Sequence, residues 1–261
     1  MTYAGLRYSL AFICLLPFLF RKQNIEEVKR LTRREWFALI ALGLLFYTFT
    51  QGTQFIGLSL LPAVTVSLLL NFTPIVVAVM GYFLISEKPS VLQWFGAFLF
   101  IIGIFTYFFP EVLAGNITIG ILVMIIGVLA NSSSAILGRS VNRSGKYSAI
   151  TVTVISMGTG SIIMLIAGIT IQGLPSISFT TILYLLWLAV INTAFAFTLW
   201  NLTLQKLTAM ESSIINGTML IQIAILAWIF IGEPITLKEG FGMLIAAAGA
   251  VLVQLKRKKN L

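Results

Sequence analysis

Nine apolar segments follow one another along the chain and leave little sequence between them. A helix needs about 20 apolar residues to cross the hydrocarbon core of a bilayer. The segments lie at about 3–20, 36–57, 62–85, 91–109, 118–137, 147–170, 179–203, 209–231 and 238–255. Only 10% of the residues are charged, whereas a soluble domain is about a quarter charged. The sequence therefore predicts an all-α, polytopic membrane protein with nine transmembrane helices and no soluble domain.

The positions of the basic residues predict how these segments cross the membrane. If the basic C-terminal tail, 256–261, is placed inside, fifteen of the 17 Lys and Arg residues fall on the inner side. Lys238 alone falls outside, and Arg7 falls within the first segment. This asymmetry predicts a multi-pass protein of the cell membrane with a cytoplasmic C-terminus. It also accounts for the net charge of +9 without a nucleic-acid partner.

Two similar phrases reveal an internal duplication. "ISEKPSVLQWFG" at 85–96 returns as "IGEPITLKEGFG" at 231–242, which is 146 residues later. The same shift superposes Glu87 on Glu233, Gly96 on Gly242 and Gly103 on Gly249, with no gap. Counting spans places Glu87 inside and Glu233 outside. The two copies are therefore expected to run in opposite directions, which is the inverted-repeat architecture of secondary transporters.

The repeated residues also have structural interpretations. Glu87 and Glu233 each precede a helix, where a carboxylate complements the positive helix end; a part in transport is the alternative. Gly96 and Gly103 are seven residues apart and share one helix face, as do Gly242 and Gly249. Such faces let helices pack closely. The same faces could serve a homodimer.

The duplication leaves one segment without a counterpart. The same shift carries the segment at 118–137 to a position before Met1. Nine spans would leave the N-terminus outside, whereas ten would give two matching sets of five. We therefore expect a ten-helix fold whose first helix is missing from this sequence.

Three stretches of the sequence resemble a known family. They are "GLRYSLAFICLLPFLF" at 5–20, "LPAVTVSLLLNFTPIVVAVMGYFLISEKPSVLQWFGAFLFIIGI" at 61–104 and "LTAMESSIINGTMLIQIAILAWIFIGEPITLKEGFGMLIAAAGAVLV" at 207–253. Together they resemble the EamA family of the drug/metabolite transporter (DMT) superfamily. The resemblance implies an incomplete first repeat at 1–109 (family helices 2–5), a second repeat at 118–255 (helices 6–10) and a cytoplasmic tail at 256–261. It also implies a central cavity lined by the first, third, fourth, sixth, eighth and ninth family helices.

Uncharged polar and aromatic residues in the middle of several segments are candidates to line such a cavity. They are Tyr47, Gln51, Gln54, Asn71, Asn131, Asn192, Trp200 and Asn216. Tyr47, Gln51 and Gln54 share one face of a helix. The alternative is that such side chains join helices by hydrogen bonds. For Trp200 the alternative is anchoring at the membrane interface.

Two charged residues have open roles. Arg7 is the one charge well inside a segment, which makes it a candidate to bind a substrate carboxylate. It could instead extend to water at the helix end or form a structural pair. Glu211 opens the segment at 209–231, where it could cap the helix or carry a proton for coupling.

These features favour a secondary transporter that moves a small organic solute by alternating access. The family resemblance suggests export of an amino acid, another metabolite or a drug-like compound, with the solute and membrane lipid as partners. The chain has no His and no Asp and a single Cys14, so metal sites and His-based catalysis are not expected, nor is a cofactor. The alternative is a non-transporting membrane scaffold or sensor, or an inactive fragment of a transporter.

Overall fold

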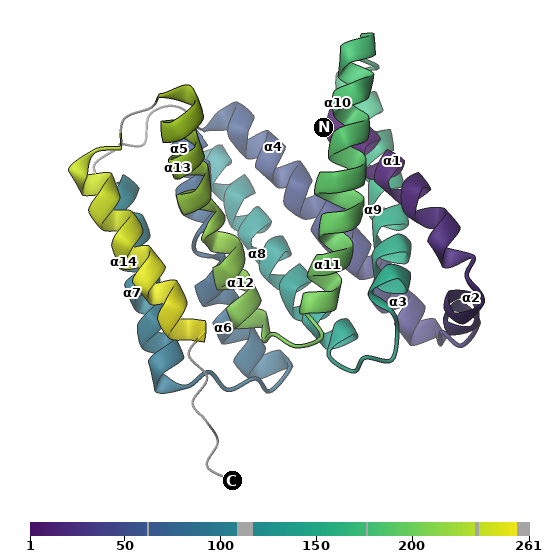
Figure 1. The fold of residues 1–261 in the computed structure, drawn as a ribbon, viewed down its shortest axis with the longest axis horizontal. Helices are drawn as coiled ribbons and strands as arrows, with labels where there is room; N and C mark the ends of the chain where they lie inside the picture. Colours follow the sequence, from purple (N-terminus) through teal and green to yellow (C-terminus); the bar gives the residue numbers. More distant parts are fainter. Residues whose placement is uncertain (62, 109–116, 176, 233–234, 255–261) are drawn as a thin grey trace. The chain divides into compact units, whose positions relative to one another are not determined.

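A computed structural model describes residues 1–61, 63–108, 117–175, 177–232 and 235–254 (Figure 1). These residues form helices and connecting turns, and no strand is found among them. The helices are α1 (Thr2–Leu19), α2 (Lys22–Lys29), α3 (Arg33–Gly43), the π-helical segment η1 (Leu44–Thr50), α4 (Gln51–Leu60), α5 (Ala63–Leu70), α6 (Thr73–Leu84), α7 (Val91–Phe108), α8 (Ile117–Asn142), α9 (Ala149–Gln172), α10 (Phe179–Ala189), the π-helical segment η2 (Val190–Phe195), α11 (Ala196–Thr203), α12 (Ala209–Gly217), α13 (Met219–Ile231) and α14 (Leu237–Gln254). The predicted all-α fold is confirmed.

Five helical stretches within the described residues are long and apolar enough to cross a membrane. They are Thr2–Leu19, Arg33–Leu60, Thr118–Asn142, Ala149–Gln172 and Phe179–Thr203, and Thr73–Leu84 and Val91–Tyr107 are shorter apolar helices. These helices make the chain a multi-pass membrane protein.

The predicted segments 62–85 and 209–231 each contain two helices instead of one. α5 ends before Asn71 and α6 begins at Thr73, directly before Pro74. Proline lacks the N–H that a continuous helix would use and clashes with the preceding turn. α12 ends at Gly217 and α13 begins at Met219, and glycine has a low helix propensity. Both segments are thus interrupted where the local sequence weakens the helix.

Reciprocal caps fix where several helices begin. The Thr208 hydroxyl accepts from the backbone of Glu211, and the Glu211 carboxylate accepts from the backbone of Thr208. Thr32 and Glu35 make the same capping box at the start of α3. These contacts satisfy backbone N–H groups that have no partner within the helix.

The duplication is visible in the helix boundaries. The shift that superposes the two sequence copies carries both ends of α3 onto those of α10, and both ends of α7 onto those of α14. It also carries Leu44, the start of the π-helical segment η1, onto Val190, the start of η2. π-helical turns are rare in proteins. Their recurrence at equivalent points shows that the two copies share an unusual backbone feature as well as sequence.

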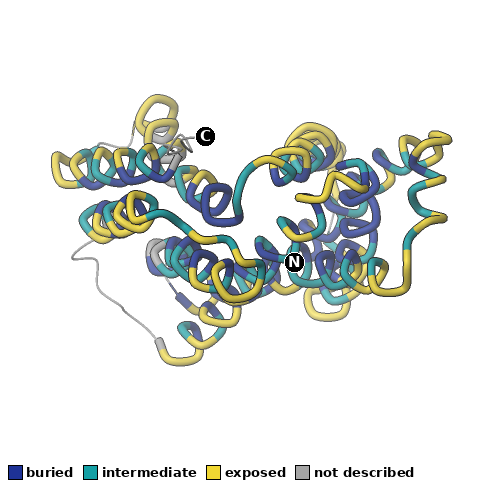
Figure 2. The backbone as a smooth tube through the Cα atoms, turned by 90° about the horizontal axis from the view of Figure 1, so that it is seen from below, coloured by how far each residue is buried: buried dark blue, intermediate teal, exposed yellow. Residues whose placement is uncertain are grey.

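The chain forms two compact units, and each combines helices from both sequence copies. Unit 1 comprises residues 1–55 and 137–207, and unit 2 comprises 56–136 and 208–261. The equivalent helices α1 and α9 lie in unit 1, whereas the equivalent helices α7 and α14 lie in unit 2. In Figure 2, buried residues lie along the helix sides that face neighbouring helices, and exposed residues lie along the outer sides.

In unit 2, α7 and α14 lie side by side (Figure 1) and touch through glycines. Gly96 faces the carbonyl of Gly249, and Gly103 faces the carbonyl of Gly242. Residue numbers rise along α7 as they fall along α14, so the helices are antiparallel. Exchanging each residue for its equivalent in the other copy turns the first contact into the second. The pair therefore has local two-fold symmetry, with the two copies running in opposite directions.

In unit 1, α1 and α9 form a second antiparallel pair of equivalent helices. Gly5 faces the backbone of Leu165, and Gly168 faces the backbone of Thr2. Tyr8, Ala11, Met157 and Met164 are buried in the core of this unit. The inverted relation of the copies therefore appears separately in each unit.

Candidate solute-binding site

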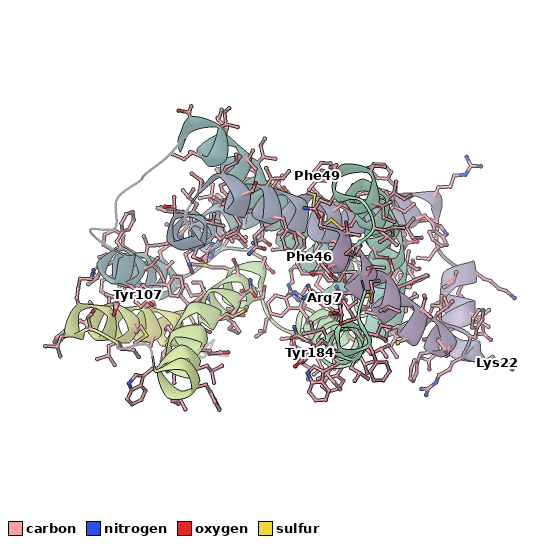
Figure 3. All side chains as sticks on the ribbon, turned by 90° about the horizontal axis from the view of Figure 1, so that it is seen from above. Arg7, Lys22, Phe46, Phe49, Tyr107 and Tyr184 are labelled. Atoms are coloured by element: carbon pink, nitrogen blue, oxygen red, sulfur yellow. The ribbon has the colours of Figure 1, made fainter. Side chains whose placement is uncertain are left out.

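Arg7 lies on the second turn of α1, among the side chains of unit 1 (Figure 3). Its Nη2 donates a hydrogen bond of 2.8 Å to the hydroxyl of Tyr8. Its Cζ lies 4.7 Å from the centroid of the Tyr8 ring, a cation–π contact. The Nε atom is buried and has no hydrogen-bond partner. The guanidinium therefore packs against an aromatic ring and retains an unused donor.

Four aromatic side chains from three elements form a cluster beside Arg7, which we call the aromatic cluster. They are Tyr8 of α1, Phe46 and Tyr47 of η1, and Phe197 of α11. The ring centroids of Tyr8 and Tyr47 lie 5.2 Å apart, and those of Phe46 and Phe197 lie 5.3 Å apart. These are edge-to-face contacts, which aromatic rings favour. Tyr8 and Tyr47 are buried, whereas Phe46 and Phe197 are half-buried.

The π-helical turn of η1 positions two of these rings. Gly43, just before η1, faces the carbonyl of Ser156 on α9 so closely that an added Cβ would lie under 3 Å from it. The Thr48 hydroxyl donates to the carbonyl of Gly160 at 3.0 Å. The Thr50 hydroxyl donates to the carbonyl of Leu45, five residues back, at 2.8 Å. The first two contacts hold η1 against α9, and the third lies within η1, whose Tyr47 belongs to the aromatic cluster.

The other residues that the sequence predicted for unit 1 lie outside this cluster. Gln51 and Gln54 are half-buried on α4, and Trp200 is half-buried on α11. Asn192 lies in η2 and is exposed. Within the described part of the chain, no hydrogen bond or ring contact joins these four residues to Arg7. The structure therefore brings Arg7 and Tyr47 together and leaves the remaining four apart.

In unit 2, two of the predicted asparagines make hydrogen bonds within the protein. Asn71 lies buried at the break between α5 and α6, and its Nδ2 donates to the carbonyl of Ser67 at 2.7 Å. Asn131 on α8 donates from Nδ2 to the Thr73 hydroxyl at 3.4 Å. Asn216 on α12 is exposed. The Asn131 contact joins two helices, as expected of a hydrogen bond that holds helices together.

Sequence reasoning missed a buried amide network in unit 1. Asn142 of α8 donates from Nδ2 to Oδ1 of Asn201 on α11 at 2.8 Å. Asn201 donates in turn to the Thr153 hydroxyl of α9 at 3.0 Å. Both asparagines lie near segment ends, where the sequence resembles a loop. Their apolar neighbours Val141 and Leu202 are the only sequence signal that either one faces the interior.

Two acidic side chains act at the start of α12. Glu87 accepts through Oε2 from the backbone N–H of Ala209 at 2.9 Å. Its carboxylate therefore meets a helix of the other copy, whereas the following helix α7 is capped by Ser90 and Gln93. Glu211 is 2% exposed and accepts from the backbone of Thr208 at 2.9 Å. Glu233 and the tail at 256–261 lie outside the described residues.

The described residues contain no group of three or more His, Cys, Asp or Glu side chains that could hold a metal ion. An apolar cavity of about 250 Å³ lies between the end of α1 and α2. It is lined by Leu19, Phe20, Ile25, Val28 and Lys29. None of the predicted site residues lines it. The predicted site residues therefore lie outside this cavity.

Comparison with known proteins agrees with this architecture. The EamA-like transporter family matches residues 1–109 and 118–255. The uncharacterized transporter YvbV of Bacillus subtilis (strain 168) is 25% identical over 269 residues, which cover 99% of this chain and 83% of that protein. A solved structure named only "Crystal structure of protein" has the same fold, with a TM-score of 0.79 at 16% identity over 97% of this chain and 86% of that one. The chain therefore belongs to the EamA-like transporter family and is a membrane transporter, not an enzyme.

Proposed function

We propose that this transporter is a secondary carrier that exports a small organic solute across the cell membrane by alternating access. The observation that carries the proposal is the antiparallel pairing of equivalent helices, α7 with α14 and α1 with α9. In inverted-repeat carriers, each copy supplies one of the two gates around a central site. A duplicated and inverted chain can thus open to either side with equivalent motions.

The interrupted helices supply points at which such a motion can occur. η1 and η2 lie at equivalent positions, and the α5–α6 and α12–α13 breaks are nearly equivalent. Helices bend preferentially at π-helical turns and at proline or glycine breaks. Conformational changes concentrate at a few such positions. Each copy therefore carries its own pair of hinges.

Several polar residues are proposed to line the solute path. They are Arg7, Tyr47, Gln51, Gln54, Asn71, Asn131, Asn192, Trp200 and Asn216. Polar side chains in membrane helices need either protein partners or a water-filled cavity. Asn192 and Asn216 are exposed at the protein surface of their units, which supports a path that water and solute can reach. Glu211 is the proposed coupling residue, and the C-terminus is proposed to lie in the cytoplasm.

The packing of the glycines bears on the proposed partners. Gly96, Gly103, Gly242 and Gly249 contact one another across α7 and α14 within one chain. Their faces are therefore occupied and give no support to a homodimer formed through them. The solute and the surrounding lipid remain the proposed partners.

Counterflow in proteoliposomes tests the carrier mechanism. Vesicles loaded with an unlabelled mixture of amino acids and organic acids are diluted into trace amounts of each labelled compound. A carrier should show saturable uptake that is accelerated by the same compound inside. Linear flux without acceleration would indicate a channel. No flux of any compound would favour a non-transporting scaffold or sensor.

A further inference from the structure

The charge of Arg7 has no carboxylate partner in its own unit. Unit 1 contains three acidic residues, Glu26, Glu27 and Glu35, and no aspartate. Glu26 pairs with Arg30 at 3.7 Å, and Glu27 accepts from the Thr151 hydroxyl at 2.7 Å. Glu35 pairs with Lys146, and this hydrogen bond raises the pKa of Lys146. All three are therefore used at other places in unit 1.

The partners that Arg7 does have are too weak to neutralise it. Among the described residues, its guanidinium contacts the hydroxyl and the ring of Tyr8. A phenol is neutral, and a ring face offers only a partial negative charge. A cation inside a membrane helix is costly unless it is paired or hydrated. The lack of a partner is clearest at Nε, which is buried and has no hydrogen-bond acceptor.

The side chains around Arg7 also indicate which chemical groups its partner has besides a negative charge. Phe46 and Phe197 of the aromatic cluster are half-buried, so part of each ring stays accessible. Aromatic rings bind flat or branched apolar groups through area and edge contacts. A guanidinium binds a carboxylate or phosphate through two parallel N–H donors. Nε and Nη2 form such a donor pair: Nε is unused, and Nη2 has a second N–H besides the one that it donates to Tyr8.

We propose that Arg7 is the anion-binding residue of this transporter and that its solute is a small organic anion with an apolar or aromatic body. The inference rests on the proposed carrier function and names its substrate class. The carboxylate accepts from the guanidinium, and the body of the solute lies against the aromatic cluster. Phospholipid headgroups also carry an anionic group, so the test must distinguish a free organic anion from a lipid.

Ligand binding to the purified protein in a neutral detergent tests the proposal without requiring transport. The probes are benzoate, phenylacetate and phenylpyruvate, each compared with benzylamine and benzyl alcohol, which have the ring without the negative charge. Thermal stabilisation reports binding because a ligand of the folded state raises the melting temperature. We expect the three anions, and neither control compound, to raise the melting temperature of the wild type.

Variants separate a binding role of Arg7 from a structural one. Arg7→Gln should weaken anion binding roughly tenfold or more, because a charge-assisted hydrogen bond is lost. Without ligand its melting temperature should equal or exceed that of the wild type, since an uncompensated charge is removed. Tyr8→Phe, which keeps the ring, should retain anion binding. The exposed Lys22→Gln removes the same charge elsewhere in unit 1 and should leave binding unchanged.

Three results would overturn the proposal. The first is an absence of stabilisation by all three anions in the wild type. The second is equal stabilisation of Arg7→Gln, or a lower melting temperature of that variant without ligand, which would indicate a structural pairing. The third is that phosphatidylglycerol added to the detergent micelles stabilises the wild type more than Arg7→Gln, whereas the free anions stabilise neither. This result would assign the site to lipid. Counterflow is measured separately, so binding without transport would contradict the carrier proposal alone.

Discussion

Units 1 and 2 are built around the same motif, an antiparallel pair of equivalent helices, but their interiors differ. In unit 2, α7 and α14 meet through small residues, and the core around them contains Ala97, Phe100, Ile104, Ala246 and Val253. In unit 1, α9 buries the hydroxyl residues Thr151, Thr153, Ser156 and Ser161, and α1 carries the guanidinium of Arg7. Both pairs of equivalent helices are therefore closely packed, but the pair in unit 1 also carries polar and charged side chains. Equivalent helices with the same backbone arrangement can therefore carry different side-chain chemistry.

The polar interior of unit 1 is stable because most of its hydroxyls are satisfied within their own helix. Thr153 donates to the carbonyl of Ala149 at 2.7 Å, and Ser156 donates to that of Val152 at 2.7 Å. Such bonds to the preceding turn satisfy a hydroxyl without a second helix and can bend the helix slightly. Unit 1 therefore combines buried hydroxyl groups with close glycine contacts such as those of Gly5 and Gly43. The polar side chains of this pair agree with the proposed anion site at Arg7 on α1.

The largest predicted effect falls on the close-packed pair. In Gly103→Ala the new Cβ would lie under 3 Å from backbone atoms of Gly242 and Ala246. Because backbone atoms cannot move aside separately, we expect a loss of about 2–3 kcal/mol in the free energy of unfolding. Reversible unfolding in mixed micelles measures it. Gly240→Ala, on α14 with no neighbouring atom within 4 Å, is the matched control and should be neutral.

A glycine in unit 1 should affect binding as well as stability. In Gly43→Ala the added Cβ would press on the carbonyl of Ser156 and displace η1, which carries Tyr47. We expect a loss of about 1–2 kcal/mol in stability together with weaker binding of benzoate. Gly138→Ala meets only flexible leucine side chains at 3.3 Å and 3.6 Å and serves as the control. Unchanged benzoate binding in a destabilised Gly43→Ala would show that η1 does not position the site.

The buried amide network should give a smaller effect. Asn201→Ala removes the partner of Asn142 and the donor to Thr153. We expect a destabilisation of about 1 kcal/mol, because hydrogen bonds between membrane helices are individually modest. A double-mutant cycle with Asn142→Ala measures the coupling between the two amides. Strict additivity of the two single changes would mean that their hydrogen bond contributes nothing to stability.

The smallest predicted effect falls on the cap of α12. Glu87→Gln keeps an acceptor for the backbone of Ala209 but removes the negative charge at the helix start. We expect a loss of about 0.5 kcal/mol in stability. The exposed Glu26→Gln is the control for a general change of charge. A large loss of transport with unchanged stability would instead give Glu87 a part in the mechanism.

The sequence was most informative where one physical constraint dominates. Nine apolar segments predict the membrane helices because the bilayer requires that length. The constant offset between the two copies predicts the equivalence of α7 and α14, and the basic residues predict their opposite directions. The positions of Gly96 and Gly103 on one face already indicate a close helix contact.

The features that the sequence could not predict depend on tertiary packing. The π-helical turns η1 and η2 arise in apolar sequence that is locally compatible with an ordinary helix. The aromatic cluster could not be found either, because Phe46 and Phe197 would look the same facing lipid or facing the interior. Asn201 was missed because burial near a segment end depends on which helix covers it. Arg7 was visible as a charge, but its unused Nε and its contact with Tyr8 required the structure.

The most direct test of the inverted architecture uses two equivalent positions at the starts of α7 and α14. Val91 and Leu237 occupy the same place in the two sequence copies, and each is 86% exposed. Single cysteines at these positions, in a Cys14→Ser background, are treated with a membrane-impermeant maleimide in intact cells and in permeabilised cells. We predict that Leu237→Cys is labelled in intact cells and that Val91→Cys is labelled only after permeabilisation. Labelling of both cysteines from the same side would contradict the inverted arrangement and, with it, the proposed pair of gates.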